Sequence, residues 1–294
     1  MKFLKIQLLI LVVVFASCEK AISFDLNETP PKLVVEATIE NGGAPLVVLT
    51  NSLDYFSTIN PQLLAASFVH DADVTISNGF QTMKLKEYQV PVGLDYNLYY
   101  YTTDSTELAT AFKGGLNSAY TLQITKEGKT YTAQTTIPDT TKAVDSIWWK
   151  PTPQSDDSTR VIVMLKATDP EGYGDYIRYY TKKNDEPFFP GLNSVFDDLF
   201  VDGTSYELAV EPGFDRNLDR DEEDLFFYRG DSVTLKLSNI DRATYDFWRT
   251  MEYSYASIGN PFATPTKVLG NISNGALGYF GGYASQTRTL VIPE

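Results

Sequence analysis

The sequence predicts a mainly β protein with two immunoglobulin-like or fibronectin-like β-sandwich domains, the second carrying one helix near residues 239–257. Two observations predict this class. Short runs that alternate between apolar and polar residues recur along the chain between turn residues, as expected of strands in a half-buried sheet. The 294 residues also include 19 Tyr and 17 Phe, and aromatic side chains pack well on pleated surfaces.

The predicted N-terminal sandwich spans residues 32–138. Two of its runs are joined by Asn78-Gly79, which predicts a hairpin with a type I′ turn, because both central positions of that turn need a positive φ. The density of short runs is typical of an immunoglobulin-like sandwich. The predicted strands are residues 33–39, 45–50, 72–77, 80–87, 97–103, 120–125 and 129–137.

The predicted C-terminal domain spans residues 142–294 and begins after Pro138 and a short polar stretch. A long insertion between about 183 and 224 interrupts its strands. Glycine, proline and aromatic residues crowd the segment 259–283, which indicates either close approach of backbones or a bulge. The predicted strands are residues 144–149, 160–168, 176–182, 206–210, 225–228 and 232–238.

The predicted helix has an apolar stripe with a spacing of three and four residues, which favours packing on a sheet. Ser238 and Asp241 have the spacing of a capping box at its start, and Gly259 can take the left-handed conformation that ends it. The stripe consists of Ile240, Ala243, Phe247, Trp248, Met251 and Tyr255.

Charge and composition exclude several classes of function. The formal net charge is −14 and no basic run is present, so nucleic acid is not an expected partner. A single His and a single Cys exclude a Cys-rich zinc site, a disulfide scaffold and a two-His metal centre. His70 is the one residue that a Ser-His-Asp hydrolase could use, but no G-x-S-x-G motif accompanies it, so a surface histidine is predicted.

Residues 1–17 have the pattern of a lipoprotein signal peptide. Lys2 and Lys5 precede an apolar run of about ten residues, which is too short to cross a bilayer as a helix. The only cysteine, Cys18, follows the small pair Ala16-Ser17 and resembles the lipidated residue of a bacterial lipobox. The alternative is an ordinary secretory signal with an incidental cysteine. Residues 18–31 then form the lipidated cysteine and a polar tether, and the acyl chains would anchor the protein stably.

The segment 215–224 is strongly acidic. Asp215, Asn217, Asp219 and Asp221 alternate like ligands of a calcium loop, and hard cations prefer several oxygen ligands. The loop lacks the turn glycine, the final glutamate and the flanking helix pair of such sites. The sequence therefore predicts either a calcium site or a solvated acidic loop neutralised by its own arginines, and no other cofactor.

Trp148 and Trp149 are adjacent in a predicted strand, so only one of them can face the core of the sheet. The other can stack on a sugar or on a partner protein. Burial of both at a domain junction is the alternative.

Several stretches together resemble an uncharacterised family of outer-membrane lipoproteins of Gram-negative bacteria that carries a domain-of-unknown-function label. They are CEKAISFDL, PKLVVEATIENGGAP, YTLQITKEGKTYTAQTTIP, GNPFA and NISNGALGYFGGY. The resemblance implies a lipid-anchored, β-rich protein that is commonly encoded beside a TonB-dependent outer-membrane receptor. It supplies one residue with a role, Cys18, and implies no reaction or ligand.

These observations favour a non-enzymatic accessory protein of the outer membrane that is anchored by lipid and has a TonB-dependent transporter or its cargo as a partner. A surface position, outside the cell, is suggested by Glu19-Lys20 directly after the cysteine. The alternative is a surface adhesin or glycan-binding module that uses exposed aromatic residues and calcium. A carboxylate-dependent hydrolase is the third candidate, although no pair of acids stands out by spacing.

Overall fold

The computed structural model describes residues 30–294 except 55–56, 93–95, 154, 219–220, 261 and 265. Cys18 and the predicted signal peptide lie outside the described residues. No helix in the described part of the chain is long and apolar enough to cross a membrane.

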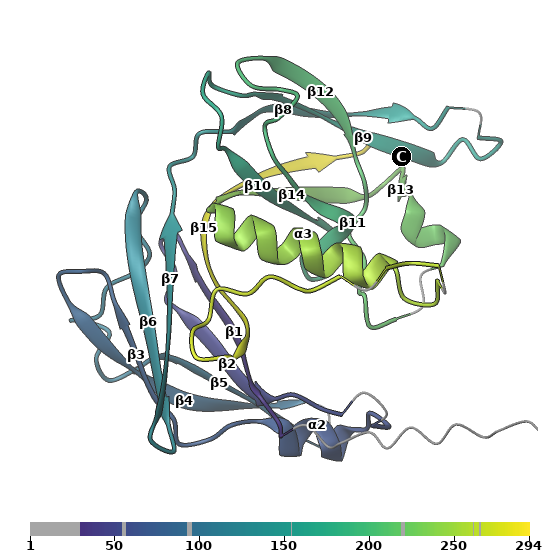
Figure 1. Cartoon of the computed structure of the whole chain (residues 1–294). Helices are drawn as coiled ribbons and strands as arrows, with labels where there is room; N and C mark the ends of the chain where they lie inside the picture. Colours follow the sequence, from purple (N-terminus) through teal and green to yellow (C-terminus); the bar gives the residue numbers. More distant parts are fainter. Residues whose placement is uncertain are drawn as a thin grey trace, which may run out of the picture. The chain divides into compact units, whose positions relative to one another are not determined.

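The fold is mainly β, as predicted (Figure 1). The strands before residue 140 are β1 (Leu33–Glu40), β2 (Leu46–Asn51), β3 (Asp73–Ser77), β4 (Thr82–Val92), β5 (Tyr96–Thr103), β6 (Ser118–Lys126) and β7 (Lys129–Ile137). Those after it are β8 (Ala143–Pro151), β9 (Arg160–Thr168), β10 (Tyr176–Lys183), β11 (Phe189–Phe196), β12 (Ser205–Val210), β13 (Phe227–Tyr228), β14 (Ser232–Ile240) and β15 (Leu277–Val291). The helices are α2 (Pro61–Ser67), the 3-10 helix η1 (Glu222–Leu225) and α3 (Arg242–Ala256).

One sheet of eleven strands runs through both halves of the described chain, in the order β11-β10-β14-β15-β1-β2-β5-β4-β3-β6-β7. The last strand, β15, joins the halves. It pairs in parallel with β1, from Val34 opposite Leu277 to Glu40 opposite Tyr283, and antiparallel with β14. Figure 1 shows β15 (yellow) continuing from its place beside β1 to its place beside β14.

The division into two separate sandwich domains is therefore not confirmed. Residues 31–294 form one compact unit. The physical reason is that β15 supplies buried side chains to both halves. Phe280 and Ala284 belong to the core of the N-terminal strands, whereas Tyr279 and Tyr283 pack with α3, and Ile292 just beyond the strand enters the core of the C-terminal half.

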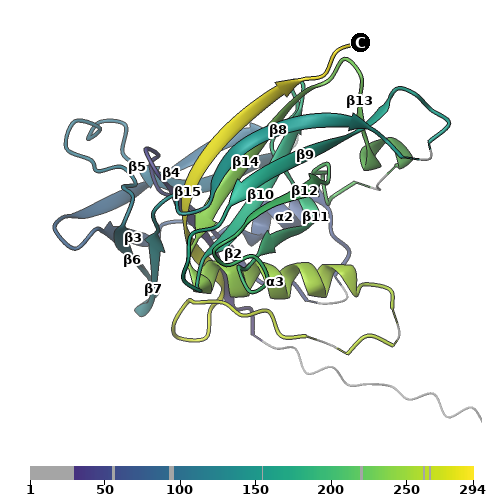
Figure 2. The ribbon, with the colours of Figure 1, turned by 90° about the horizontal axis from the view of Figure 1, so that it is seen from above.

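A second, smaller sheet covers one face of the C-terminal half. β9 lies between β12 and β13 and also pairs with β8. Figure 2 shows β8 and β9 running over β14 and β10. Val163 and Leu165 of β9 share a core with Ile177 of β10 and Leu235 of β14, so the two sheets face one another as the layers of a sandwich.

The predicted helix is present as α3, but the prediction of its start was wrong. Asp241 is the N-cap and accepts a hydrogen bond from the backbone N of Thr244, whereas Ser238 pairs within β14. The β14 ladder continues to Ile240, so the helix begins only after it. Phe247 and Trp248 of the apolar stripe pack against Tyr279 of β15, which confirms helix-to-sheet packing.

The predicted hairpin joins β3 and β4, but its turn is not of type I′. Gly79 has φ +85°, whereas Asn78 is not among the residues with a positive φ. Instead, Asn78 Oδ1 accepts hydrogen bonds from the backbone N of Phe80 and Gln81. The side chain of the asparagine thus stabilises a longer loop between Ser77 and Thr82.

The glycine-rich segment near the C-terminus allows β15 to approach its neighbours closely, as predicted. A Cβ at Gly282 would lie 2.5 Å from the carbonyl oxygen of Thr136 in β7. A Cβ at Gly278, which also has φ +93°, would clash with the carbonyl oxygen of Val35 in β1. The aromatic residues between the glycines fill the cores on both sides.

We predict that Gly282→Ala destabilises the protein by about 1–3 kcal/mol, because the added methyl group meets backbone that cannot rotate away. The free energy of unfolding from denaturant titration measures the effect. Gly115→Ala is the matched control, since the nearest atom to its new Cβ would be a side-chain atom, Ser118 Oγ at 3.2 Å, and not backbone. Equal stability of the two variants would contradict close approach of the backbones at Gly282.

Candidate functional site

A cavity of about 870 Å³ in the C-terminal half lies between the two sheets. β9 and β12 form one wall, β10, β11 and β14 form the other, and α3 borders it. Most of its lining is apolar, including Leu165, Tyr179, Val195, Leu208, Val210 and Leu237. Cavities of this size and character are typical of sites for small molecules.

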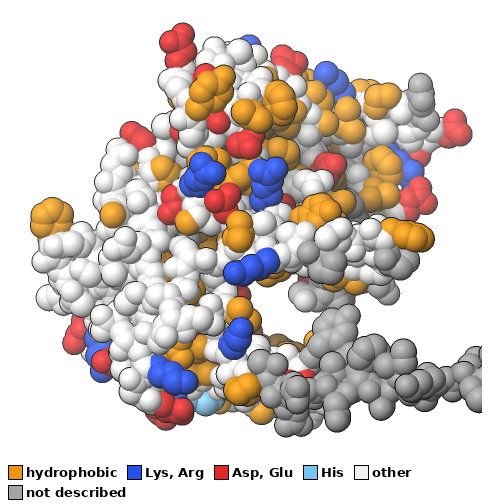
Figure 3. Space-filling view, in the orientation of Figure 1, with side chains coloured by type: hydrophobic (Ala, Val, Ile, Leu, Met, Phe, Trp, Pro, Cys, Tyr) orange, Lys and Arg blue, Asp and Glu red, His pale blue; other side chains and the backbone are white. Residues whose placement is uncertain are grey.

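The rim of this cavity exposes large apolar side chains to solvent. Phe200 is 93% exposed and Leu199 is 61% exposed, both in the loop that follows β11. Tyr253 of α3 also lines the cavity and is 55% exposed. Figure 3 shows hydrophobic side chains (orange) at the surface of the upper half of the visible face. Exposed apolar groups that border an apolar cavity indicate a binding surface.

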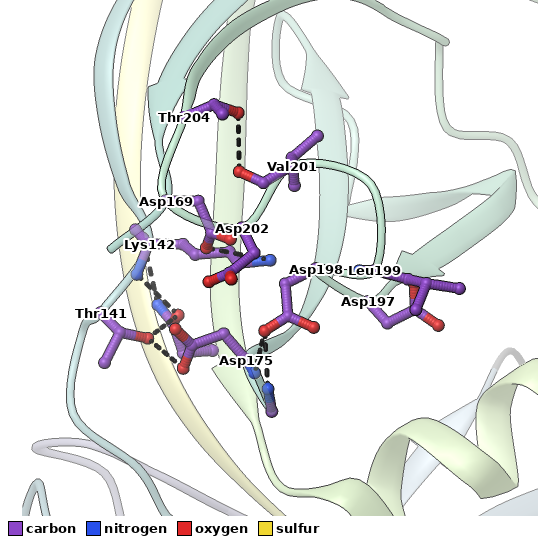
Figure 4. A network of polar contacts seen from close by, with 12 residues as sticks. Thr141, Lys142, Asp169, Asp175, Asp197, Asp198, Leu199, Val201, Asp202 and Thr204 are labelled. Atoms are coloured by element: carbon purple, nitrogen blue, oxygen red, sulfur yellow. Dashed lines mark hydrogen bonds and ion pairs between the residues drawn. The ribbon is translucent and has the colours of Figure 1, made fainter. Parts of the chain in front are cut away.

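The rim loop, residues 197–204, is held by its own aspartates (Figure 4). Asp198 Oδ2 accepts hydrogen bonds from the backbone N of Gly174 at 2.6 Å and of Asp175 at 2.9 Å. Asp202 Oδ1 accepts one from Gly172 at 2.7 Å. These contacts tie the rim loop to the segment between β9 and β10.

The same two aspartates meet Asp169, which follows β9. One carboxylate oxygen from each of Asp169, Asp198 and Asp202 lies within 4.8 Å of the other two. Asp169 and Asp198 are buried. Lys142, itself 1% exposed, places its Nζ 3.2 Å from Asp169 Oδ1. Of the three carboxylates, that of Asp169 is therefore the one paired with the buried lysine.

The pKa values of Asp169 and Asp198 are shifted in opposite directions. Burial raises the pKa of Asp169, although the ion pair with Lys142 opposes this effect. Burial also acts to raise the pKa of Asp198, but hydrogen bonds from the backbone N of Asp175 and Gly174 outweigh it and leave that pKa below its usual value. Asp198 is thus held ionised at neutral pH.

These oxygens form a donor set suited to a hard divalent cation. In the described part of the chain, Asp169, Asp198 and Asp202 are the acidic residues close enough to share one ion. Both carboxylate oxygens of Asp169 are buried; Oδ1 faces Lys142 Nζ at 3.2 Å, and Oδ2 has no hydrogen-bond partner among the described residues. Lys142 supplies one positive charge, so a divalent cation would balance the remaining negative charges.

The calcium loop predicted from the sequence lies elsewhere. Asp219 falls outside the described residues. Asp215 Oδ1 accepts hydrogen bonds from the backbone N and side-chain Nδ2 of Asn217, and Asp221 caps η1. The side chain of Arg216 pairs with Glu252 of α3 and not with the acids of its own segment; its Nη2 lies 2.9 Å from Glu252 Oε1.

The two adjacent tryptophans of β8 are both half-buried. Trp149 packs against the core of the C-terminal half and lies under the guanidinium of Arg229, at 4.7 Å. Trp148 has Lys150 Nζ 5.7 Å from its ring centroid. Neither tryptophan lines the cavity between the sheets.

His70, the single histidine, lies in the N-terminal half, with its Nδ1 2.5 Å from Glu87 Oε1.

Residues 19–289 match the domain of unknown function DUF4249. The chain belongs to this family. The match covers nearly the whole described chain, including both sheets, the cavity and the three aspartates. A comparison with curated proteins gives no significant match.

Sequence reasoning missed the cavity and the cluster of aspartates. Asp169 is separated from Asp198 by a complete β-hairpin, so no local spacing connects them. One signal was present: Gly172 and Gly174 beside Asp175, and Gly203 after Asp202, are typical of tight loops. The structure gives all three glycines a positive φ.

We predict that Lys142→Met costs about 3–5 kcal/mol of stability in metal-free buffer, because it leaves the Asp169 carboxylate buried without its ion-pair partner. Denaturant unfolding measures the loss. The double variant Lys142→Met/Asp169→Asn should recover most of it.

Lys84→Met is the control, since the Lys84–Asp73 pair is exposed and such pairs contribute about 0–1 kcal/mol. A Lys142→Met variant as stable as Lys84→Met would show that the buried Lys142–Asp169 pair does not contribute to the free energy of unfolding.

Proposed function

We propose that the protein is a non-enzymatic accessory of the outer membrane, anchored through Cys18, that partners a TonB-dependent transporter and holds its cargo in the cavity between the two sheets. The apolar cavity of about 870 Å³ with its exposed rim is the observation that carries this proposal. The signal-like residues 1–17 and the family resemblance support the anchor and the partner.

The chemistry of the cavity favours binding over catalysis. Its lining is dominated by aliphatic and aromatic side chains, which remove apolar ligand surface from water at about 25 cal/mol per Å². Two of its charged groups have protein partners: Lys142 pairs with Asp169, and Glu252 pairs with Arg216. These pairs fix the positions of both charged groups at the wall of the cavity.

The accessory role is tested by affinity purification of the tagged protein from its native outer membrane in mild detergent. We expect a TonB-dependent barrel to be recovered with it in near-equal amount. Recovery of the protein alone, while the barrel stays intact in the extract, would refute the partnership. Mass spectrometry of an organic extract of the same sample identifies bound cargo.

Leu208→Trp tests whether the cavity holds that cargo. Leu208 of β12 lines the cavity and is 36% exposed, so a larger side chain fills the space without entering the core. We expect the apolar cargo to be lost while the barrel is still recovered. Leu98→Trp in β5 is the matched control at 42% exposure. Equal amounts of cargo in both variants would place the cargo site elsewhere.

A calcium-dependent adhesin or glycan-binding module is the second candidate, favoured by the position of Asp198 and Asp202 on the rim loop itself. A cation bound there would order Leu199 and Phe200 at the opening of the cavity. Binding of this kind couples ligand affinity to calcium concentration.

We predict that millimolar calcium raises the melting temperature by several degrees, because a cation that binds only the folded state stabilises it. Asp202→Asn should abolish the shift while keeping the oxygen that accepts from Gly172. Asp215→Asn in the acidic segment is the matched comparison. A shift lost only in Asp215→Asn would assign calcium to that segment, and no shift in the unmodified protein would remove the second candidate.

A further inference from the structure

A second cavity, of about 520 Å³, lies on the opposite face of the large sheet. Side chains alternate between the two faces of a strand. In β10, Ile177 and Tyr179 accordingly line the first cavity, whereas Arg178 and Tyr180 line the second. Trp248 of α3 and the segments 188–190 and 214–217 complete its walls. The volume suits a molecule of about the size of a dipeptide.

Arg178 is the unusual group in this cavity. Its residue is 3% exposed, and no carboxylate of the described residues lies within 4.0 Å of its guanidinium. Nε donates to Ser194 Oγ at 3.2 Å, and no hydrogen bond from either terminal nitrogen is found among the described residues. The guanidinium carbon lies 3.3 Å from the ring centroid of Trp248 and 4.8 Å from that of Tyr180. Glu252 and Glu36 attract this cation from beyond 4.0 Å, so no carboxylate forms a hydrogen-bonded ion pair with it. A buried guanidinium gains from a carboxylate that contacts it directly.

The other cations of the cavity already have partners. Lys236 Nζ lies 2.5 Å from Glu40 Oε2, and Arg216 pairs with Glu252. Glu36 lies on the same wall, where desolvation raises the pKa of its carboxyl against the attraction of Arg178. Among the described residues that line this cavity, Arg178 is therefore the positive charge that has no carboxylate within 4.0 Å, and Glu36 acts on it only from a longer distance.

Hydroxyl groups lie close to this charge. Trp248 Nε1 donates to Tyr283 Oη at 2.9 Å, and Tyr283 Oη is 3.2 Å from Tyr279 Oη. Burial raises the pKa of Tyr279 well above its usual value, so its hydroxyl keeps its proton. Burial raises the pKa of Tyr180 in the same way. Neutral hydroxyls of this kind can donate hydrogen bonds to an anion.

We propose that Arg178 anchors a binding site for the carboxylate of a small aromatic or apolar acid. The planar guanidinium matches the two oxygens of a carboxylate. Trp248 and Phe188 offer aromatic surface to the rest of the molecule. A dianion such as a phosphate monoester fits less well, because Glu36, Glu40 and Asp215 line the same cavity and repel a second negative charge. This proposal does not rest on the proposed cargo role, because the site lies in a different cavity.

Calorimetric titration of the full chain with N-acetyl-phenylalanine and with its amide tests this site. The two probes have nearly the same size and differ in charge. We expect the acid to bind at least about tenfold more tightly than the amide, because only the acid completes the Arg178 ion pair. Arg178→Met should remove this preference, and Arg178→Lys, which keeps the charge but loses the planar fork, should retain only part of it. Arg242→Met, at the start of α3 with a side chain that is 76% exposed, is the control and should leave the preference unchanged.

Equal affinity for acid and amide, or no binding of either at millimolar concentration, would overturn the proposal and leave Arg178 as a structural cation held by Trp248. This comparison uses the unmodified protein, so it remains decisive even where Arg178→Met does not fold. The tripeptide Ala-Ala-Phe distinguishes the source of the carboxylate. Affinity equal to that of N-acetyl-phenylalanine would indicate peptide termini as ligands, and weaker binding would indicate free organic acids.

Discussion

The pairing of β15 with both β1 and β14 is the constraint on which the rest of the structure depends. Without it, the strands before residue 140 and those after it would form separate sheets. The parallel β1–β15 ladder brings the two ends of the described chain together, and parallel pairing requires a long connection between the strands. Gly278 makes the approach to β1 feasible and Gly282 makes the approach to β7 feasible, because no Cβ intervenes between the backbones.

This arrangement also explains why two different cavities flank one sheet. Side chains alternate along β10 and β14, so that one row lines the cavity toward the smaller sheet and the other lines the cavity beside α3 and β1. The first row is apolar, and the second contains the cations and Tyr180. One cavity is therefore mostly apolar and the other is aromatic and charged. Glu252 of α3 links them, because it lines the first cavity and pairs with Arg216, which lines the second. Its oxygens also accept from the backbone N and Oγ of Ser194, the residue that holds Arg178.

The sequence predicted those strands that bury one face. Residues 33–39 and 160–168 alternate clearly and lie in β1 and β9, because each presents a single apolar row to a core. β15 was missed for the opposite reason: residues 279–284 are all buried, so no period of two appears. β11 was missed because Pro190, Gly191 and Asn193 interrupt its pattern, which an edge strand tolerates. α2 had a readable signal in Asn60-Pro61, since Asn60 Oδ1 caps the backbone N of Leu63.

The candidate sites were harder to predict than the strands. Asp169, Asp198 and Asp202 come from two loops that only the sheet topology brings together. Arg178 could be assigned to one face of β10 by alternation, but local sequence does not reveal that Trp248 covers that face. The acidic segment 215–224 stands out by its composition. Composition, however, shows only how many charges a segment carries, and not whether their oxygen atoms lie close enough together to bind a ligand.

The cavity between the sheets is, in our proposal, a binding site for an apolar ligand. A crystal structure of the protein purified from its own membrane, without unfolding or delipidation, tests this most directly. We expect electron density for a bound apolar molecule between β12 and α3, with Leu199 and Phe200 folded against it. A cavity closed by its own side chains, with no bound molecule and these two residues packed inside, would contradict the proposal.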